Sequence, residues 1–222
     1  MAYPRVVLDP DDVPNRLAAI SPQITLPLLR QALLDGYTAK VSCTENDPPF
    51  FKGTSFYART TRSLRDQLVP QDWWKNDDRN FSRVISPDDR IAIAVMGGDS
   101  STGNWSREPK TRSKKGPATI DAVEANIHQG ELFPVDEVVT RAARAKNAIT
   151  WVLLYATFLG QGRRTIRAEF SLPASMDADG RITKWAARII LPAIHDDYHS
   201  GKGVRGPEPT PDISISVRRR SS

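Results

Sequence analysis

The sequence predicts an α+β fold: a mixed or antiparallel sheet, with a C-terminal three-stranded meander at residues 149–191, packed against several helices. Residues 149–159 are apolar at successive positions, which is typical of a central strand buried on both faces. The two segments that follow alternate apolar and polar residues around the turn signal Asp179-Gly180. Helical periodicity at residues 25–36 and 54–68 supplies the helices that such a sheet needs to cover its apolar surface.

The composition is that of an ordinary globular protein. Of 222 residues, 39% are hydrophobic and 26% are charged. This length suits one domain, so we expect an N-terminal arm at residues 1–21, a single α+β domain at 22–199, and a linker with a basic tail at 200–222. Cys43 is the only cysteine, which excludes an intrachain disulfide and a thiolate zinc cluster. Because neither a signal-peptide pattern nor a membrane-length apolar run is present, we expect a cytoplasmic protein with no membrane partner.

Periodicity and cap residues predict these elements in the N-terminal half: a helix from Thr25 to Gly36, a half-buried strand at 37–43, a helix at 54–68, a short strand near 81–85 and a buried strand at 91–96. Thr25 is a good N-cap residue, and Gly36 can end a helix in the left-handed conformation. Residues 37–43 are assigned to a strand because their side chains alternate between apolar and polar. This places Cys43 on the buried face, where a thiol is normally inert.

The C-terminal half is predicted from the same signals: a helix with Pro117 in its first turn, a helix at about 135–146, and strands at 149–159, 165–172 and 182–191. In the second of these strands, Ile166, Ala168, Phe170 and Leu172 are expected to face the core. In the third strand the expected core residues are Trp185, Ala187, Ile189 and Leu191. The polar side chains of both strands are therefore expected on a solvent-facing surface.

A long basic loop, from Gly97 to Ala118, is the most informative segment for function. It contains Trp105 and the cations Arg107, Lys110, Arg112, Lys114 and Lys115. The first 100 residues carry 12 Lys and Arg against 13 Asp and Glu, whereas the remainder carries 19 against 13. A loop of this length is typically functional or disordered, and its charge indicates an anionic partner.

Two further groups of cations join this loop as candidate contacts to phosphate. One is a helical stripe formed by Arg59, Arg62 and Arg65 at i, i+3 spacing, and the other lies on the expected solvent face of the meander and its turn, at Arg163, Arg164, Arg167, Lys184 and Arg188. Trp105 can stack on a base. We therefore expect a non-enzymatic protein that contacts the backbone of DNA or RNA without strong base readout. For each group, a simply solvated surface is the alternative.

Enzymatic signatures are weak. Gly98 to Gly103 fits the glycine spacing of a P-loop, but Asn104 and Trp105 stand where Lys and Ser or Thr are required. A backbone anion nest or a plain glycine turn remain as interpretations of that segment. The segment from His195 to His199 could supply two metal ligands if it were helical, but a third ligand would have to come from elsewhere.

Other functions remain as alternatives. A protein-interaction subunit of a larger intracellular assembly would use the basic loop and the anchors Trp73, Trp74 and Trp105. A metal-dependent hydrolase or nuclease would use the His195 to His199 segment, or Asp99 and Glu169 with Lys184. For Glu169 the simpler account is a cross-strand salt bridge with a basic neighbour. We assign no catalytic residue, cofactor or metal.

Overall fold

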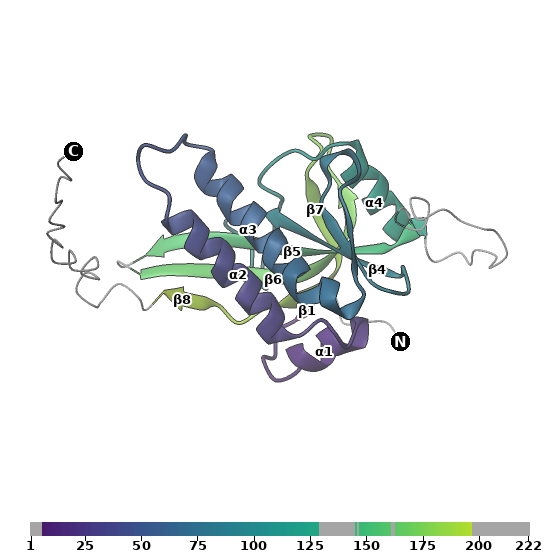
Figure 1. Cartoon of the computed structure of the whole chain (residues 1–222). Helices are drawn as coiled ribbons and strands as arrows, with labels where there is room; N and C mark the ends of the chain where they lie inside the picture. The colour runs from purple at the N-terminus through teal and green to yellow at the C-terminus, as the bar shows by residue number, and fades with distance from the viewer. Residues whose placement is uncertain (1–5, 129–144, 146, 161–162, 197–222) are drawn as a thin grey trace, which may run out of the picture.

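The computed structural model describes residues 6–128, 145, 147–160 and 163–196. Its helices are α1 (Val13–Ile20), α2 (Leu26–Val41), α3 (Phe51–Leu68) and α4 (Pro117–His128), with short 3-10 turns η1 (Val69–Gln71) and η2 (Asp78–Asn80). Its strands are β1 (Val6–Val7), β2 (Trp74–Asn76), β3 (Arg83–Ile85), β4 (Ile91–Gly97), β5 (Ile149–Gly160), β6 (Arg163–Met176), β7 (Ile182–Ile190) and β8 (Ile194–Asp196). Figure 1 shows α2 and α3 side by side across the sheet.

The sheet is mixed, which confirms the predicted α+β class. Its strand order is β1-β7-β6-β5-β4-β3-β2, and β8 pairs with β6. Strands β5, β6 and β7 form the predicted antiparallel meander, and β5 lies in the middle of the sheet. Strand β4 runs parallel to β5, with Gly97 opposite Tyr155 at its carboxyl end. The strand predicted at residues 91–96 is also confirmed, since β4 covers it.

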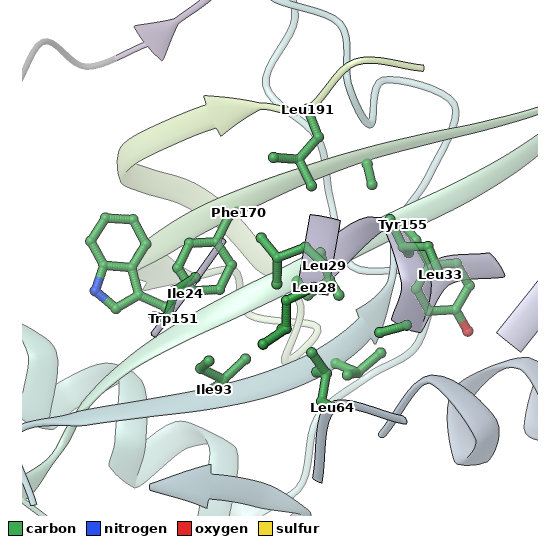
Figure 2. Packing of buried hydrophobic residues seen from close by; sticks show 14 of the residues in the cluster. Ile24, Leu28, Leu29, Leu33, Leu64, Ile93, Trp151, Tyr155, Phe170 and Leu191 are labelled. Atoms are coloured by element: carbon green, nitrogen blue, oxygen red, sulfur yellow. The ribbon is translucent and has the colours of Figure 1, made fainter. Parts of the chain in front are cut away.

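Both faces of the sheet are covered, because β5 is apolar on both of its faces. On one face Leu153 and Phe170 join the large core cluster with residues of α1, α2 and α3, which Figure 2 shows from close by. On the other face Val152 and Leu154 form a smaller cluster with Val123 of α4. A strand with two apolar faces requires helices on both, and α4 supplies the second layer.

The prediction of a strand at residues 37–43 is wrong, because this segment continues α2 as far as Val41. Thr25 caps this helix as expected, accepting a hydrogen bond from the Leu28 backbone N–H. Gly36 does not end the helix. It lies where α2 crosses α3, and a Cβ there would collide with Thr60 Oγ1 and lie 2.8 Å from the Phe56 carbonyl oxygen. Alternation over a few residues cannot distinguish a strand from a helix held in place by its neighbour.

The predicted inward set of β7 is partly wrong. On β6, Leu172 pairs with Ala187 of β7, and the next residue, Pro173, pairs with Trp185. Ala186 is therefore an extra residue on β7 with no partner in this pairing. This β-bulge turns Trp185 to the α4 side of the sheet, while Ala187 and Ile189 remain in the large core cluster. Turn signals and alternation do not reveal an inserted residue in a strand.

The remaining expected segments have separate outcomes. Within the expected arm, residues 6–20 form β1 and α1, and Val13 and Leu17 are fully buried. The helix with Pro117 in its first turn is confirmed. Most of the helix expected at 135–146 and all of the tail at 200–222 lie outside the described residues. The basic loop, expected from Gly97 to Ala118, is the connection between β4 and α4, and below the name refers to residues 98–116.

Candidate functional site

The helical stripe of α3 is neutralised in part by ion pairs. Arg62 Nε lies 3.2 Å from Asp66 Oδ2, and Arg65 Nη2 lies 2.7 Å from Asp77 Oδ1. Arg65 also donates hydrogen bonds to the carbonyl oxygens of Asn76 and Arg83, so it fastens α3 to the edge of the sheet. Arg59 is exposed and lies beside Arg62 in a depression that also contains acidic residues. The stripe is therefore mainly a structural and mixed-charge surface.

The cations of the meander do not share one solvent face. Arg188 is buried at 2% exposure with its guanidinium on Glu169, which corrects its placement at the surface. Lys184 pairs with Glu108 at 2.6 Å. The Arg167 guanidinium lies 4.0 Å from the centre of the Phe158 ring. The predicted cross-strand salt bridge of Glu169 is present, in the interior and not at the surface.

The basic loop is fastened to the sheet by its backbone. Within the loop the Asp99 N–H donates to the Lys110 carbonyl oxygen at 2.9 Å, and the Arg112 N–H donates to the Gly97 carbonyl oxygen of β4 at 2.8 Å. Thr111 is fully buried and its N–H donates to the Ile182 carbonyl oxygen. These bonds separate the loop into two parts, with Trp105 and Arg107 beside Lys184 on one side and Arg112, Lys114 and Lys115 on the other.

The second part forms a basic cleft with segments that are distant in the sequence. Its volume is about 750 Å³. The cations that line it are Lys40, Lys52, Arg79, Arg112, Lys114 and Lys115, and in the described part of the chain no Asp or Glu lines it. Phe50, Tyr57 and Phe81 supply aromatic surface, and Phe50 is 70% exposed. Lysine and arginine thus come from the end of α2, the start of α3, η2 and the basic loop.

Some of these cations have carboxylate partners and some have none. Arg79 Nη2 lies 2.6 Å from Asp121 Oδ2, and Lys114 Nζ lies 3.7 Å from Asp179 Oδ1. Lys40, Lys52, Arg112 and Lys115 make no ion pair with another described residue. The unpaired cations therefore give the cleft an excess of positive charge, and charges held close together in a concave surface reinforce the potential there.

Burial and, for the two lysines, neighbouring positive charge shift the pKa values of three groups in the cleft. Burial lowers the pKa of Lys40, and the charges of Arg112, Arg164 and Lys52 lower it further. Burial also lowers the pKa of Lys115, with a smaller contribution from Arg181. Burial raises the pKa of Tyr155 to about 12, so its hydroxyl is protonated and can donate a hydrogen bond. A bound anion would relieve the mutual repulsion of these cations.

Sequence reasoning finds Arg112, Lys114 and Lys115 but misses Lys40, Lys52 and Arg79. Alternation places Lys40 on the polar face of a strand, whereas it lies on the last turn of α2 and donates a hydrogen bond to Thr157 Oγ1 of β5. Lys52 stands alone in the sequence, without neighbouring cations. The remaining candidates lie elsewhere: Lys110 and Arg163 are exposed outside the cleft, and Arg164 lines a neighbouring depression that shares Lys40 and Lys52.

The glycine segment is not an anion nest. The Gly98 N–H donates to the Tyr155 carbonyl oxygen, and the Thr102 and Asn104 N–H groups donate to carbonyl oxygens of the same turn. The Asp99 carboxylate accepts from the Ser101 N–H at 2.9 Å. These donors are already used inside the protein, so the segment is a closed turn.

The alternative sites are not assembled as expected. Among the residues that the structure describes, no three His, Cys, Asp or Glu side chains are grouped so as to hold a metal ion. His195 lies in strand β8 and not in a helix, and residues 197–199 lie outside the described part. Cys43 follows α2, is partly exposed, and donates to the Ala39 carbonyl oxygen. Trp73 is buried at 2% exposure, so it offers no anchor to a partner.

Comparison of the chain with protein-family models, with curated protein sequences and with solved structures finds no match. Each helix in the described part of the chain is too short or too polar to cross a bilayer.

Proposed function

We propose that the protein binds single-stranded nucleic acid in the basic cleft, with phosphates on the lysine and arginine side chains and bases against the aromatic ones. The observation that carries this proposal is the convergence of six cations from four separate segments, four of them without an ion-pair partner among the described residues. Several phosphate contacts made together release counterions, which makes such binding strong at low salt and weak at high salt.

The size and the aromatic lining of the cleft favour a polymer over a lone anion. One phosphate group has the size of a few water molecules, each ~30 Å³, and fills little of a cleft of about 750 Å³. Phe50, Phe81 and Tyr57 line the same cleft as the cations. Bases are free to stack on such rings when the strand is unpaired, and this stacking is tolerant of sequence.

Fluorescence anisotropy with a labelled single strand of about ten nucleotides tests the proposal at low and at high salt. Changing Arg112, Lys114 and Lys115 together to Ala should weaken binding strongly at low salt and reduce the salt slope by about 0.7 for each phosphate that the variant no longer neutralises. The matched control changes Arg59, Arg107 and Lys110 to Ala, which removes the same charge outside the cleft. Equal weakening in both variants, or no binding by the wild-type protein, would reject the proposal.

An exposed tryptophan favours a second candidate function, contact with a protein partner. Trp105 is 66% exposed and lies beside Val6, away from the basic cleft. Large exposed aromatic side chains are frequent energetic centres of protein interfaces. Changing Trp105 to Ala should abolish co-purification of a protein partner without altering nucleic-acid affinity. Unchanged co-purification would remove this candidate.

A further inference from the structure

Gly97 at the end of β4 and Tyr155 of β5 both line the basic cleft, and we call this part of the cleft its floor. Gly97 ends β4 directly opposite Tyr155 of β5. The Tyr155 ring is stacked on Phe56 of α3 with 4.0 Å between ring centres, which holds it in one orientation. In Figure 2 its hydroxyl oxygen points away from the other labelled core side chains. This hydroxyl makes no hydrogen bond to another described residue, although its ring is buried.

The absence of a side chain at residue 97 keeps this floor open. A Cβ there would lie 3.9 Å from the Tyr155 hydroxyl oxygen and 4.0 Å from Arg112 Cβ. These are ordinary contact distances, so a methyl group would fit without a clash and would occupy space between the two side chains. The Arg112 backbone is held beside the same strand end by its hydrogen bond to the Gly97 carbonyl oxygen.

Lys40, Lys52 and Arg112 line the same cleft as Gly97 and Tyr155. Lys40 donates to Thr157 Oγ1, two residues beyond Tyr155 on β5. Burial lowers the pKa of Lys40, and the charges of Arg112, Arg164 and Lys52 lower it further. Among the described residues, no carboxylate lines the cleft to balance them. A phosphodiester inside a strand carries a single negative charge, whereas a phosphate monoester carries about −1.5 to −2 at neutral pH and has three free oxygens.

We propose that Arg112, Lys40 and the Tyr155 hydroxyl bind the terminal phosphate monoester of a nucleic-acid strand, at the floor formed by Gly97. This inference rests on the proposed function and specifies which part of the strand occupies the floor of the cleft. The dianion matches the local excess of positive charge, and its free oxygens accept from the guanidinium and the hydroxyl. The rest of the strand leaves along the cleft toward Lys114 and Lys115.

Three single strands of one sequence and about ten nucleotides test this inference: one with a 5′ phosphate, one with a 3′ phosphate and one with hydroxyls at both ends. One phosphorylated strand should bind about ten-fold more tightly than the unphosphorylated strand, as expected for charge-assisted hydrogen bonds to one added group. Which of the two binds tightly identifies the end that is recognised.

Variants at the floor separate this inference from the proposed function. Gly97→Ala and Tyr155→Phe should each reduce the preference for the phosphorylated strand several-fold, with little effect on the unphosphorylated one. Lys110→Ala, an exposed cation outside the cleft, is the matched control and should keep the preference. Equal binding of all three strands by the wild-type protein overturns the inference alone, and binding of none overturns the proposed function with it. Thermal unfolding midpoints confirm that each variant is folded.

Discussion

Arg188 of β7 donates two hydrogen bonds to one oxygen of Glu169 on β6, at 2.9 Å from Nε and 2.6 Å from Nη2 to Oε2. Both side chains are buried. The same guanidinium donates to the carbonyl oxygens of Asn104 and Arg107 in the basic loop, at 2.9 Å each. One interior arginine therefore joins the meander to the part of the loop that carries Trp105.

Removal of Arg188 should destabilise the protein, because Glu169 would remain buried without its partner. We expect Arg188→Met to lower the free energy of unfolding by about 3–5 kcal/mol near pH 8. The double variant Arg188→Met with Glu169→Leu should recover part of this loss, since an apolar pair needs no compensating charge. Urea unfolding of both single variants and the double variant measures the coupling. Additive losses would contradict a direct interaction.

Glu169 should make stability depend on pH. Burial raises its pKa to about 7 from an ordinary value of 4.5, against the charge and hydrogen bonds of Arg188. Between these two pH values the folded protein binds more protons than the unfolded chain, so the free energy of unfolding decreases as the pH rises through this window. Between about pH 5 and about pH 8 the free energy of unfolding should fall by about 2–3 kcal/mol because of Glu169, and Glu169→Gln should lack this fall. Urea unfolding at about pH 5 and about pH 8 measures it, and parallel pH profiles would contradict it.

Gly36 should be required for the close approach of α2 and α3. Gly36→Ala introduces a Cβ that collides with Thr60 Oγ1, so we expect a loss of about 1–3 kcal/mol. Gly53→Ala is the matched control in α3, because nothing lies within 4 Å of its added Cβ. It should stabilise the helix by up to ~1 kcal/mol. Thermal unfolding of the two variants should therefore shift in opposite directions, and equal shifts would count against this account.

The Trp185 side chain should hold the basic loop against the sheet. Its indole N–H donates to the Pro109 carbonyl oxygen at 2.9 Å, and the ring is buried. Trp185→Phe should cost about 1 kcal/mol or more and speed hydrogen exchange of the Thr111 amide, which bonds to the Ile182 carbonyl oxygen. Trp105→Phe, at an exposed position, should change neither quantity. Unchanged exchange in Trp185→Phe would contradict this role.

Most strands and helices could be predicted from local patterns, and the failures have identifiable causes. The residues 37–43 alternate like a strand, yet packing of α2 on α3 at Gly36 keeps them helical. The β-bulge at Ala186 reverses the orientation of Trp185, although the hydrophobic pattern of β7 is regular. Both errors arise because the conformation of a short segment depends on the residues that pack against it in space. The local sequence pattern carries no information about those residues.

For the candidate site, prediction reached one segment of the cleft and missed the rest. Arg112, Lys114 and Lys115 are adjacent in a conspicuous loop, so their charge is visible in the sequence. Lys40 and Lys52 are isolated residues that enter the cleft only because α2 and α3 lie side by side across one face of the sheet (Figure 1). Arg188 has the sequence appearance of a surface cation, but the basic loop covers it.

Three features are set by the amino-acid sequence alone: the burial of both faces of β5, the meander, and the excess of cations in the C-terminal half. These features follow from the hydrophobicity and charge of the residues, which do not depend on the tertiary fold. The convergence of cations and the interior pairing of Arg188 depend on that fold. Electrostatic attraction and desolvation act over a few ångströms in space, and folding brings residues to these distances from any separation along the sequence.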